Sequence, residues 1–429
     1  MSTMTAIDPK ATILPLLEGG AWPNSAEALE VVRSLPVPTS KTEAWKYTRV
    51  GKLFNQNYSA PDGNAEVALP ERLPFPTLRL VFVNGVFHRE LSDELSPMKG
   101  VVMGCMRDGM NSPEFAARYV SITPVHERLF SAMNTASPTD GLFLHLQGDH
   151  ELEQPVHVLH ITSGGGQLIQ PRDLILLEDG VKAEIIFEHF VASEAKRSGP
   201  GALTSLVNIV REFALGEGAS LTVHKLQREV NGPAHICQES VRIEAKGHFS
   251  IDTTTLEGTL VRNDLNVSLA GPEAHAELNG VYLLNGTTHC DNHTYIGHDV
   301  PDCTSDELYK GIIAEKGTGV FNGKVYVKQD AQRTRAYQSN ANILQGDDAR
   351  IFTKPELEIY ADDVKCSHGC TIGRLDEKGL FYLRSRGVSE AEARRMLSHA
   401  FMTDVLERIT NEDWRKHLAG LIDAKLETL

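Results

Sequence analysis

One stretch near the C-terminus combines the side chains most able to bind a metal. It runs from Asp362 to Cys370 and reads DDVKCSHGC. If it forms an extended strand, alternate side chains share a face, so Cys366, His368 and Cys370 would point the same way. Thiolate and imidazole are ligands suited to iron–sulfur or zinc chemistry. We also expect Lys365 and a protonated His368 to lower the pKa of the Cys366 thiol.

The same stretch does not make a complete metal site. It supplies three ligands at most, whereas iron–sulfur clusters and structural zinc sites usually take four. A second chain would therefore have to supply the rest. Gly369 would allow the strand to bend and turn Cys370 away. The alternative interpretation is a turn that carries two ordinary thiols, and the local pattern leaves both interpretations open.

A second group of metal-binding side chains lies between His289 and Cys303. Its first ten residues read HCDNHTYIGH. The spacings match no zinc-ribbon or zinc-finger pattern. We favour the interpretation that these side chains form hydrogen bonds between neighbouring strands, with a structural zinc site as the alternative.

The N-terminal third mixes helices with one hairpin. Residues 1–58 carry apolar side chains at helical spacing, and Ser40 with Glu43 predicts a capping box. Residues 59–77 hold four prolines and predict a long loop. Residues 78–87 read LRLVFVNGVF, a strand, an Asn-Gly turn and a second strand. Residues 112–134 again have a helical pattern.

From residue 141 to residue 365 the pattern is that of short β-strands separated by turns. Turn glycines such as Gly218, Gly247 and Gly271 recur roughly every 25 to 30 residues, a period typical of β-solenoid coils. A β-sandwich would also give short strands, but with closer turn spacing. We therefore predict a mainly β protein built on a parallel β-helix.

The C-terminal residues return to a helical pattern. Asp376 is placed to cap one helix that Gly387 ends, and Ser389 with Glu392 predicts a capping box for the next. Trp414 lies in a last helix. Because a β-solenoid leaves unpaired strand edges at its ends, we expect the flanking helices to cover them.

Composition narrows the classes of function. The chain carries 57 acidic and 42 basic side chains, a formal charge of -15, which disfavours binding to nucleic acid or anionic lipid. It contains no P-loop, no G-x-S-x-G and no H-E-x-x-H motif. No apolar run approaches a membrane span, and the N-terminus lacks the basic region of a signal peptide. We therefore expect a cytoplasmic protein whose six cysteines are free thiols or metal ligands.

Several separated motifs resemble those of one protein family. They are EAWKYT at 43–48, DNHT at 291–294, FNGK at 321–324, KPELEIYADDVKCSHG at 354–369 and LFYLRSRG at 380–387. Over nearly its whole length the chain resembles the SufB/SufD family of iron–sulfur cluster assembly scaffold proteins. Within that family it is similar to the SufD members, because SufB members typically have Glu where this chain has Ser367.

The resemblance implies an architecture and partners. The fold would be a right-handed parallel β-helix, residues 141–370. It would lie between an N-terminal helical and α+β region, residues 1–140, and a C-terminal helical domain, residues 371–429. SufB would pair through the β-helix, and the SufC ATPase would dock on the C-terminal helices. The chain would be a scaffold, not an enzyme, and would bind no nucleotide. The resemblance leaves a homodimer of the isolated chain open.

The resemblance also assigns candidate site residues. His368 matches a family histidine implicated in iron or nascent cluster assembly at the SufB–SufD interface, where it faces a SufB cysteine. Cys366 matches a family cysteine of less defined role. Cys370 stands where the family usually has a small residue such as Ala, and it receives no role. The alternatives from other classes are a secreted-type β-helix polysaccharide lyase or hydrolase and a structural zinc protein using residues 289–303.

Overall fold

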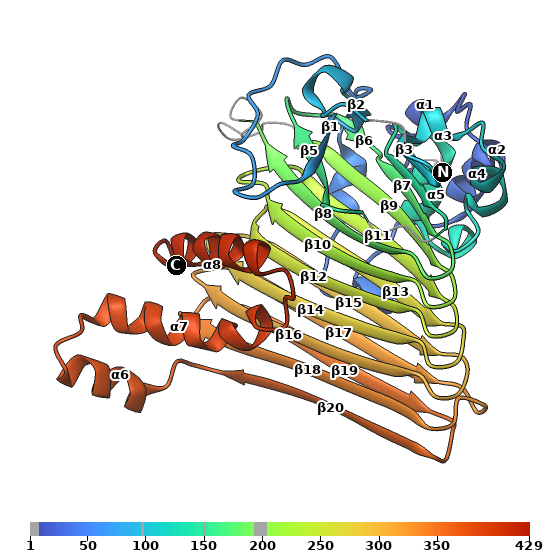
Figure 1. Cartoon of the computed structure of the whole chain (residues 1–429). Helices are drawn as coiled ribbons and strands as arrows, with labels where there is room; N and C mark the ends of the chain where they lie inside the picture. Colours follow the sequence, from blue (N-terminus) through green and yellow to red (C-terminus); the bar gives the residue numbers. More distant parts are fainter. Residues whose placement is uncertain (1–7, 96–97, 149–151, 193–203) are drawn as a thin grey trace, which may run out of the picture.

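A computed structural model describes residues 8–95, 98–148, 152–192 and 204–429 of the chain. The chain forms a long stack of β-strand coils with helices packed against its flanks (Figure 1). No helix among the described residues is both long enough and apolar enough to cross a membrane.

The stack has two walls, each a sheet of mostly parallel strands. The first sheet comprises β2 (Val86–Phe87), β1 (Leu78–Val83), β5 (Val156–Thr162), β8 (Lys182–Val191), β10 (Ser220–Arg228), β12 (His248–Glu257), β14 (His275–Leu284), β16 (Thr304–Ala314), β18 (Thr334–Gln345) and β20 (Val364–Gly373). The second comprises β19 (Arg350–Ile359), β17 (Thr318–Val327), β15 (His289–His298), β13 (Leu260–Leu269), β11 (Ala234–Ile243), β9 (Leu206–Leu215), β7 (Arg172–Leu177), β4 (Leu142–Leu146) and β3 (Val101–Cys105), with β6 (Leu168–Ile169) beside β9.

Successive strands from β7 onward alternate between the two sheets, and each pairs in parallel with the strand one coil earlier. This connectivity confirms the predicted mainly β fold with a parallel β-solenoid. It rules out a β-sandwich, whose sheets are antiparallel. The predicted Asn84–Gly85 hairpin is also present, since β1 and β2 pair antiparallel and both turn residues have positive φ.

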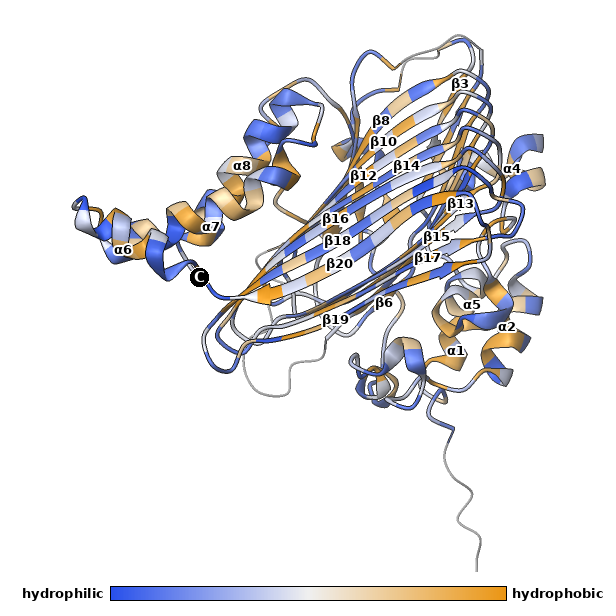
Figure 2. Ribbon diagram, turned by 90° about the horizontal axis from the view of Figure 1, so that it is seen from below, coloured by the Kyte–Doolittle hydropathy of each residue, from blue (hydrophilic) through white to orange (hydrophobic). Residues whose placement is uncertain are grey.

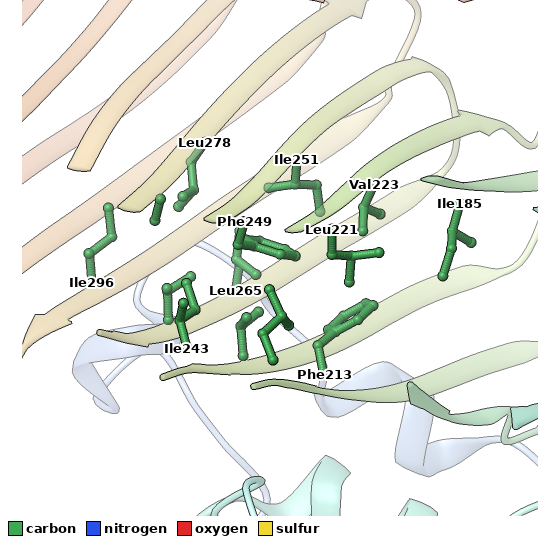
Figure 3. Close-up of a cluster of buried hydrophobic side chains, with 14 of the residues drawn as sticks. Ile185, Phe213, Leu221, Val223, Ile243, Phe249, Ile251, Leu265, Leu278 and Ile296 are labelled. Carbon is green, nitrogen blue, oxygen red and sulfur yellow. The ribbon is translucent and has the colours of Figure 1, made fainter. Parts of the chain in front are cut away.

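In-register stacking builds the core. Leu221 of β10 aligns with Phe249 of β12, which aligns with Ala276 of β14, and all three are buried. Figure 3 shows such side chains from both walls filling the space between the sheets. Because side chains alternate along a strand, every second residue enters this core. Each fully buried aliphatic side chain contributes about 1.5–3 kcal/mol to folding.

The N-terminal segment adds several short helices. They are α1 (Leu14–Leu17), α2 (Ser25–Ser34), α3 (Met106–Gly109), α4 (Pro113–Arg118) and α5 (Leu129–Ala136), with 3₁₀ turns η1 (Glu43–Trp45), η2 (Gly51–Asn55), η3 (Arg89–Leu91) and η4 (Val125–Glu127). The predicted capping box at Ser40 and Glu43 is wrong. Thr42 precedes η1 and makes no side-chain cap, because a three-residue 3₁₀ turn does not present the amides that such a box satisfies.

The EAWKYT motif attaches this segment to the outer face of the second sheet. The Arg262 guanidinium of β13 lies 3.9 Å from the Trp45 ring centroid and donates to the Ala44 carbonyl at 2.7 Å. The same guanidinium pairs with Asp264 at 2.7 Å and Asp291 at 2.6 Å. This motif therefore has a structural role, because a buried arginine and an indole ring hold the segment in place.

Three helices follow the solenoid: α6 (Glu377–Ser385), α7 (Glu390–Leu406) and α8 (Glu412–Leu426). The predicted caps at Asp376, Ser389 and Gly387 are confirmed, but the capping box is only half formed, because the Glu392 carboxylate pairs with Arg395 at 2.8 Å instead. Asp376 accepts from the Lys378 amide at 3.0 Å, Ser389 accepts from the Glu392 amide at 3.2 Å, and Gly387 has a φ of 90°.

These helices do not cover the end of the solenoid, so that expectation is wrong. Figure 2 shows α7 and α8 beside the first sheet, with the edge of β20 exposed. The apolar faces of α7 and α8, including Met402 and Trp414, pack on the outward-facing residues Val281, Leu283 and Ile312. The apolar side chains that need burial lie on the flank of the sheet, and the helices pack there.

A charged histidine joins α8 to the first sheet. His224 of β10 is buried between Asp252 and Glu184, and its Nε2 lies 2.8 Å from Glu184. Trp414 donates to Asp252 at 3.3 Å and Asn411 donates to Glu184 at 2.7 Å. Burial alone would lower the pKa of His224, but the two carboxylates outweigh it and raise that pKa to about 9.

We predict that docking of α8 weakens in alkaline solution. The folded-state pKa of His224 lies above its ordinary value of 6.5, so its contribution to stability is complete below that value and is lost as the pH rises through about 9. Hydrogen exchange of α8 amides, measured from pH 6 to pH 10 and corrected for the intrinsic exchange rate, should show the change. His224→Gln should remove the pH dependence and cost about 1–3 kcal/mol, because buried Asp252 and half-buried Glu184 lose their charged partner.

The matched control is His126→Gln, which removes a 71%-exposed histidine of the N-terminal region whose acidic neighbour is Glu27 and not a residue of α8. It should keep the wild-type pH profile. A His224→Gln profile identical to wild type would show that this histidine does not hold the helix.

Candidate metal site at the open end of the solenoid

The last coil leaves both sheets unfinished. β20 pairs with β18 and β19 pairs with β17, and among the described residues neither strand has a second neighbour in its sheet. One row of backbone amides and carbonyls on each strand is therefore free to pair with another chain. Figure 2 views the molecule from this side.

The residues predicted to share a face do so. Cys366, His368 and Cys370 align with three buried residues of β18 that point into the solenoid, namely Ala336, Gln338 and Asn340. No coil of the described residues covers β20, so its inward-facing row is exposed at His368 and Cys370 and half-buried at Cys366. Gly369 does not bend the strand, because the pairing register continues unbroken from Val364 to Gly373.

The side chains of Cys366, His368 and Cys370 do not enclose a metal position. Alternate residues on a strand are about 6.6 Å apart at Cα, so the three side chains form a line and not a cage. A metal bound by Cys366 and His368 would have open coordination positions toward the solvent. A second polypeptide at the free edge could fill them.

The expected lowering of the Cys366 pKa is wrong. Partial burial raises the pKa of this thiol, and the Ala336 amide only partly opposes that effect. The physical reason is strand alternation: Lys365 is adjacent in sequence, but its side chain lies on the opposite face of β20. At neutral pH the thiol is therefore mostly protonated, and a metal ion binding there must displace the proton.

The second group of metal-binding side chains is divided between the two faces of β15. His289 and His293 face outward, where His289 lies 2.8 Å from the Thr48 hydroxyl and His293 lies 2.9 Å from Asp291. Cys290 faces inward and is buried. The Cys303 thiol lies in the following turn and donates to the Gly271 carbonyl at 3.3 Å. Hydrogen bonding accounts for these contacts.

Sequence reasoning missed a charged network inside the solenoid. Arg211 of β9 is fully buried and donates to Asp173 at 2.8 Å, Glu239 at 3.0 Å and His189 at 3.0 Å. Lys225 of β10 also pairs with Glu239. A signal was present, because these charged residues occupy inward positions of otherwise apolar strands. Without the pairing register, however, the sequence did not show which charges meet.

Comparison with known proteins connects this architecture to a family. A family model described as SUF system FeS cluster assembly, SufBD core domain, matches residues 160–401, more than half of the chain. A second, SufBD protein N-terminal region, matches residues 24–158. The chain belongs to the SufBD family. Membership in this family favours cluster assembly over the polysaccharide-active alternative.

Relatives of this SufBD-family chain span nearly its full length. An iron–sulfur cluster assembly SufBD family protein of Synechocystis is 32% identical over 89% of this chain and 86% of the relative. The iron–sulfur cluster assembly protein SufD of Escherichia coli is 28% identical over 94% of this chain and 93% of its own. SufD of Bacillus subtilis is 23% identical over 94% of this chain and 93% of its own length. The resemblance inferred from the motifs is thereby confirmed.

Thiol labelling should separate the cysteines of this SufBD-family chain into two classes. With iodoacetamide at neutral pH, we expect exposed Cys370 to react first and half-buried Cys366 more slowly, because the pKa of Cys366 is raised. Buried Cys237 and Cys290, whose pKa values burial raises to about 12, should react only after unfolding. Peptide mass spectrometry over time measures each rate. Rapid labelling of Cys237 in the native chain would contradict the closed core.

Proposed function

We propose that this chain is a SufD-type scaffold subunit that pairs with SufB at the open end of its solenoid and binds the SufC ATPase. Its family places it in iron–sulfur cluster assembly by the SUF system. The observation that carries the proposal is the open end itself. β19 and β20 both have a free edge, and β20 carries the row of candidate metal ligands. This chain alone does not supply enough ligands to complete a metal site.

Apolar exposure supports a partner at this end. Tyr337, Ile359, Tyr360 and Ile372 lie on or next to the last strands, and between 38% and 59% of each is exposed. An exposed strand edge pairs readily with a strand of another chain, and neighbouring apolar side chains then lose their contact with water. A SufB solenoid end would meet both requirements, and so would a second copy of this chain in isolation.

His368 and Cys366 would then stand at the seam between two chains. Imidazole and thiolate bind iron, and a partner's ligand could complete the set around iron or a nascent cluster. The bound species would be transient cargo that passes through the seam. We assign no ligand role to Cys370.

The C-terminal helices offer a second surface. Phe381 and Tyr382 of α6 are 76% and 57% exposed. Large aromatic side chains are frequent anchors of protein interfaces. We assign this surface to SufC. Because the chain has no P-loop, nucleotide hydrolysis would belong to SufC, and this chain would act without catalytic activity of its own. Six free cysteines agree with a reducing cytosolic location.

The proposal is tested by replacing His368 in the three-protein assembly. His368→Ala should co-purify with SufB and SufC as wild type does, because the ring is exposed and supports no buried contact. Anaerobic reconstitution with iron and sulfide should give at least a ten-fold lower cluster yield, followed by visible absorbance and iron content. The control is His126→Ala, which removes a 71%-exposed histidine of the N-terminal region.

Two results would count against the proposal. Unchanged cluster yield with His368→Ala would reject His368 as a site residue. Failure of the wild-type chain to co-purify with SufB and SufC would reject the scaffold assignment itself.

A further inference from the structure

The inward column beneath His368 changes character at its last three rungs. In the first sheet Val223, Ile251 and Leu278 stack in register deep inside the solenoid. The next rungs of the same column are Glu307, Gln338 and finally His368. An apolar column thus becomes polar two rungs before the open end.

Glu307 is buried without a basic partner. Its side chain accepts one hydrogen bond, from the Gln338 amide nitrogen at 2.7 Å. Every other buried carboxylate among the described residues lies within 4.0 Å of a Lys, Arg or His side chain: Asp140, Asp173, Asp252, Asp264, Asp291, Glu188, Glu212, Glu229 and Glu239. Of the buried carboxylates in the part of the chain that the structure describes, only Glu307 lacks a positive charge to balance its ionised form.

Unused oxygen atoms gather around this carboxylate. Glu307 Oε1, Gln338 Oε1 and the Thr294 hydroxyl are all buried and have no hydrogen-bond partner among the described residues. Burial raises the pKa of the Glu307 carboxyl, and the nearby Thr294 hydroxyl and Gln338 amide only partly oppose it, so the pKa is about 7. Buried polar atoms without partners are uncommon in folded proteins, and three of them around one carboxylate leave room for a bound ion or water molecule.

Two sequence motifs converge on the same place. Thr294, the last residue of DNHT, aligns on the facing sheet with Gly323 of FNGK. A Cβ atom on Gly323 would lie 2.4 Å from the Gln338 amide nitrogen. Glycine at this position therefore leaves the space in which the Gln338 amide reaches Glu307.

We propose that Glu307, the Gln338 amide oxygen and the Thr294 hydroxyl form an inner binding position for a divalent metal ion beneath His368. This inference deepens the proposed function. It rests on that function for one point, that the natural ion is iron moving toward the interface with SufB. Carboxylate, amide and hydroxyl oxygens suit divalent cations of this kind, and the ion would supply the positive charge that Glu307 lacks.

The position is close to the open end. Two strand spacings of about 4.8 Å each separate the Glu307 rung from β20, so the ion would lie about 10 Å inside. Gln338 is the one rung between Glu307 and His368 in this column. Movement of its flexible side chain would admit an ion from the row that carries His368.

The test measures Mn²⁺ binding to the isolated full-length chain by electron paramagnetic resonance. The wild-type chain should bind one Mn²⁺ ion. Glu307→Gln should lower the affinity for Mn²⁺ at least ten-fold, because the amide keeps the shape of the side chain but removes its charge. The matched control is Asp306→Asn, which removes the neighbouring charge on the outer face, where Asp306 pairs with Arg408. The control should stay within two-fold of wild type.

Thermal unfolding of each variant verifies that it folds. If Glu307→Gln does not fold, Thr294→Val, which removes one oxygen at nearly constant volume, takes its place and should weaken Mn²⁺ at least three-fold. Equal Mn²⁺ binding by wild type and the inner-position variant, or no Mn²⁺ binding by wild type, overturns the inner position.

Neither outcome bears on co-purification with SufB and SufC or on the cluster yield of His368→Ala. The inner position and the proposed function can therefore fail separately.

Discussion

The structure depends on one constraint: each coil of the solenoid must present to the next a row of inward side chains in matching register. Where two coils meet, apolar rows such as Leu221, Phe249 and Ala276 bury each other. Beyond β20 the described part of the chain forms no further coil, and the same inward row faces the open end. A position that would be core in the middle of the stack thereby becomes a place where a ligand or a second chain can bind.

Strand alternation explains why much of this was predictable. A two-residue period, recurring turn glycines and helix-capping residues are local signals, and they indicated the solenoid, the hairpin at Asn84 and the caps at Asp376 and Ser389. The shared face of Cys366 and His368 follows from the same period. The prediction for the pKa of Cys366 is wrong because Lys365 is a neighbour in sequence only, and alternation directs the two side chains to opposite faces.

Interactions between coils were not predictable. Arg211 meets Asp173 across 38 residues of sequence, and the contact exists only because β9 and β7 stack in one register. The lack of a basic partner for Glu307 could not be predicted for the same reason, because it depends on which side chains the neighbouring coils place beside it. A single sequence shows which residues face inward, but it does not show which of them share a column.

The position of a buried charge along the stack determines how it can be satisfied. Arg211 and Glu239 lie where coils close on both sides, so their charges must be matched as the chain folds, and the network matches them internally. Glu307 lies two rungs from an open end. A buried carboxylate without a basic partner costs free energy in the isolated chain, about 1–3 kcal/mol or more. Near the open end that cost can be recovered after folding, by an ion that enters past Gln338. The unfinished end of the solenoid can therefore carry a buried carboxylate without a basic partner, whereas the buried carboxylates deeper in the stack are matched by basic side chains.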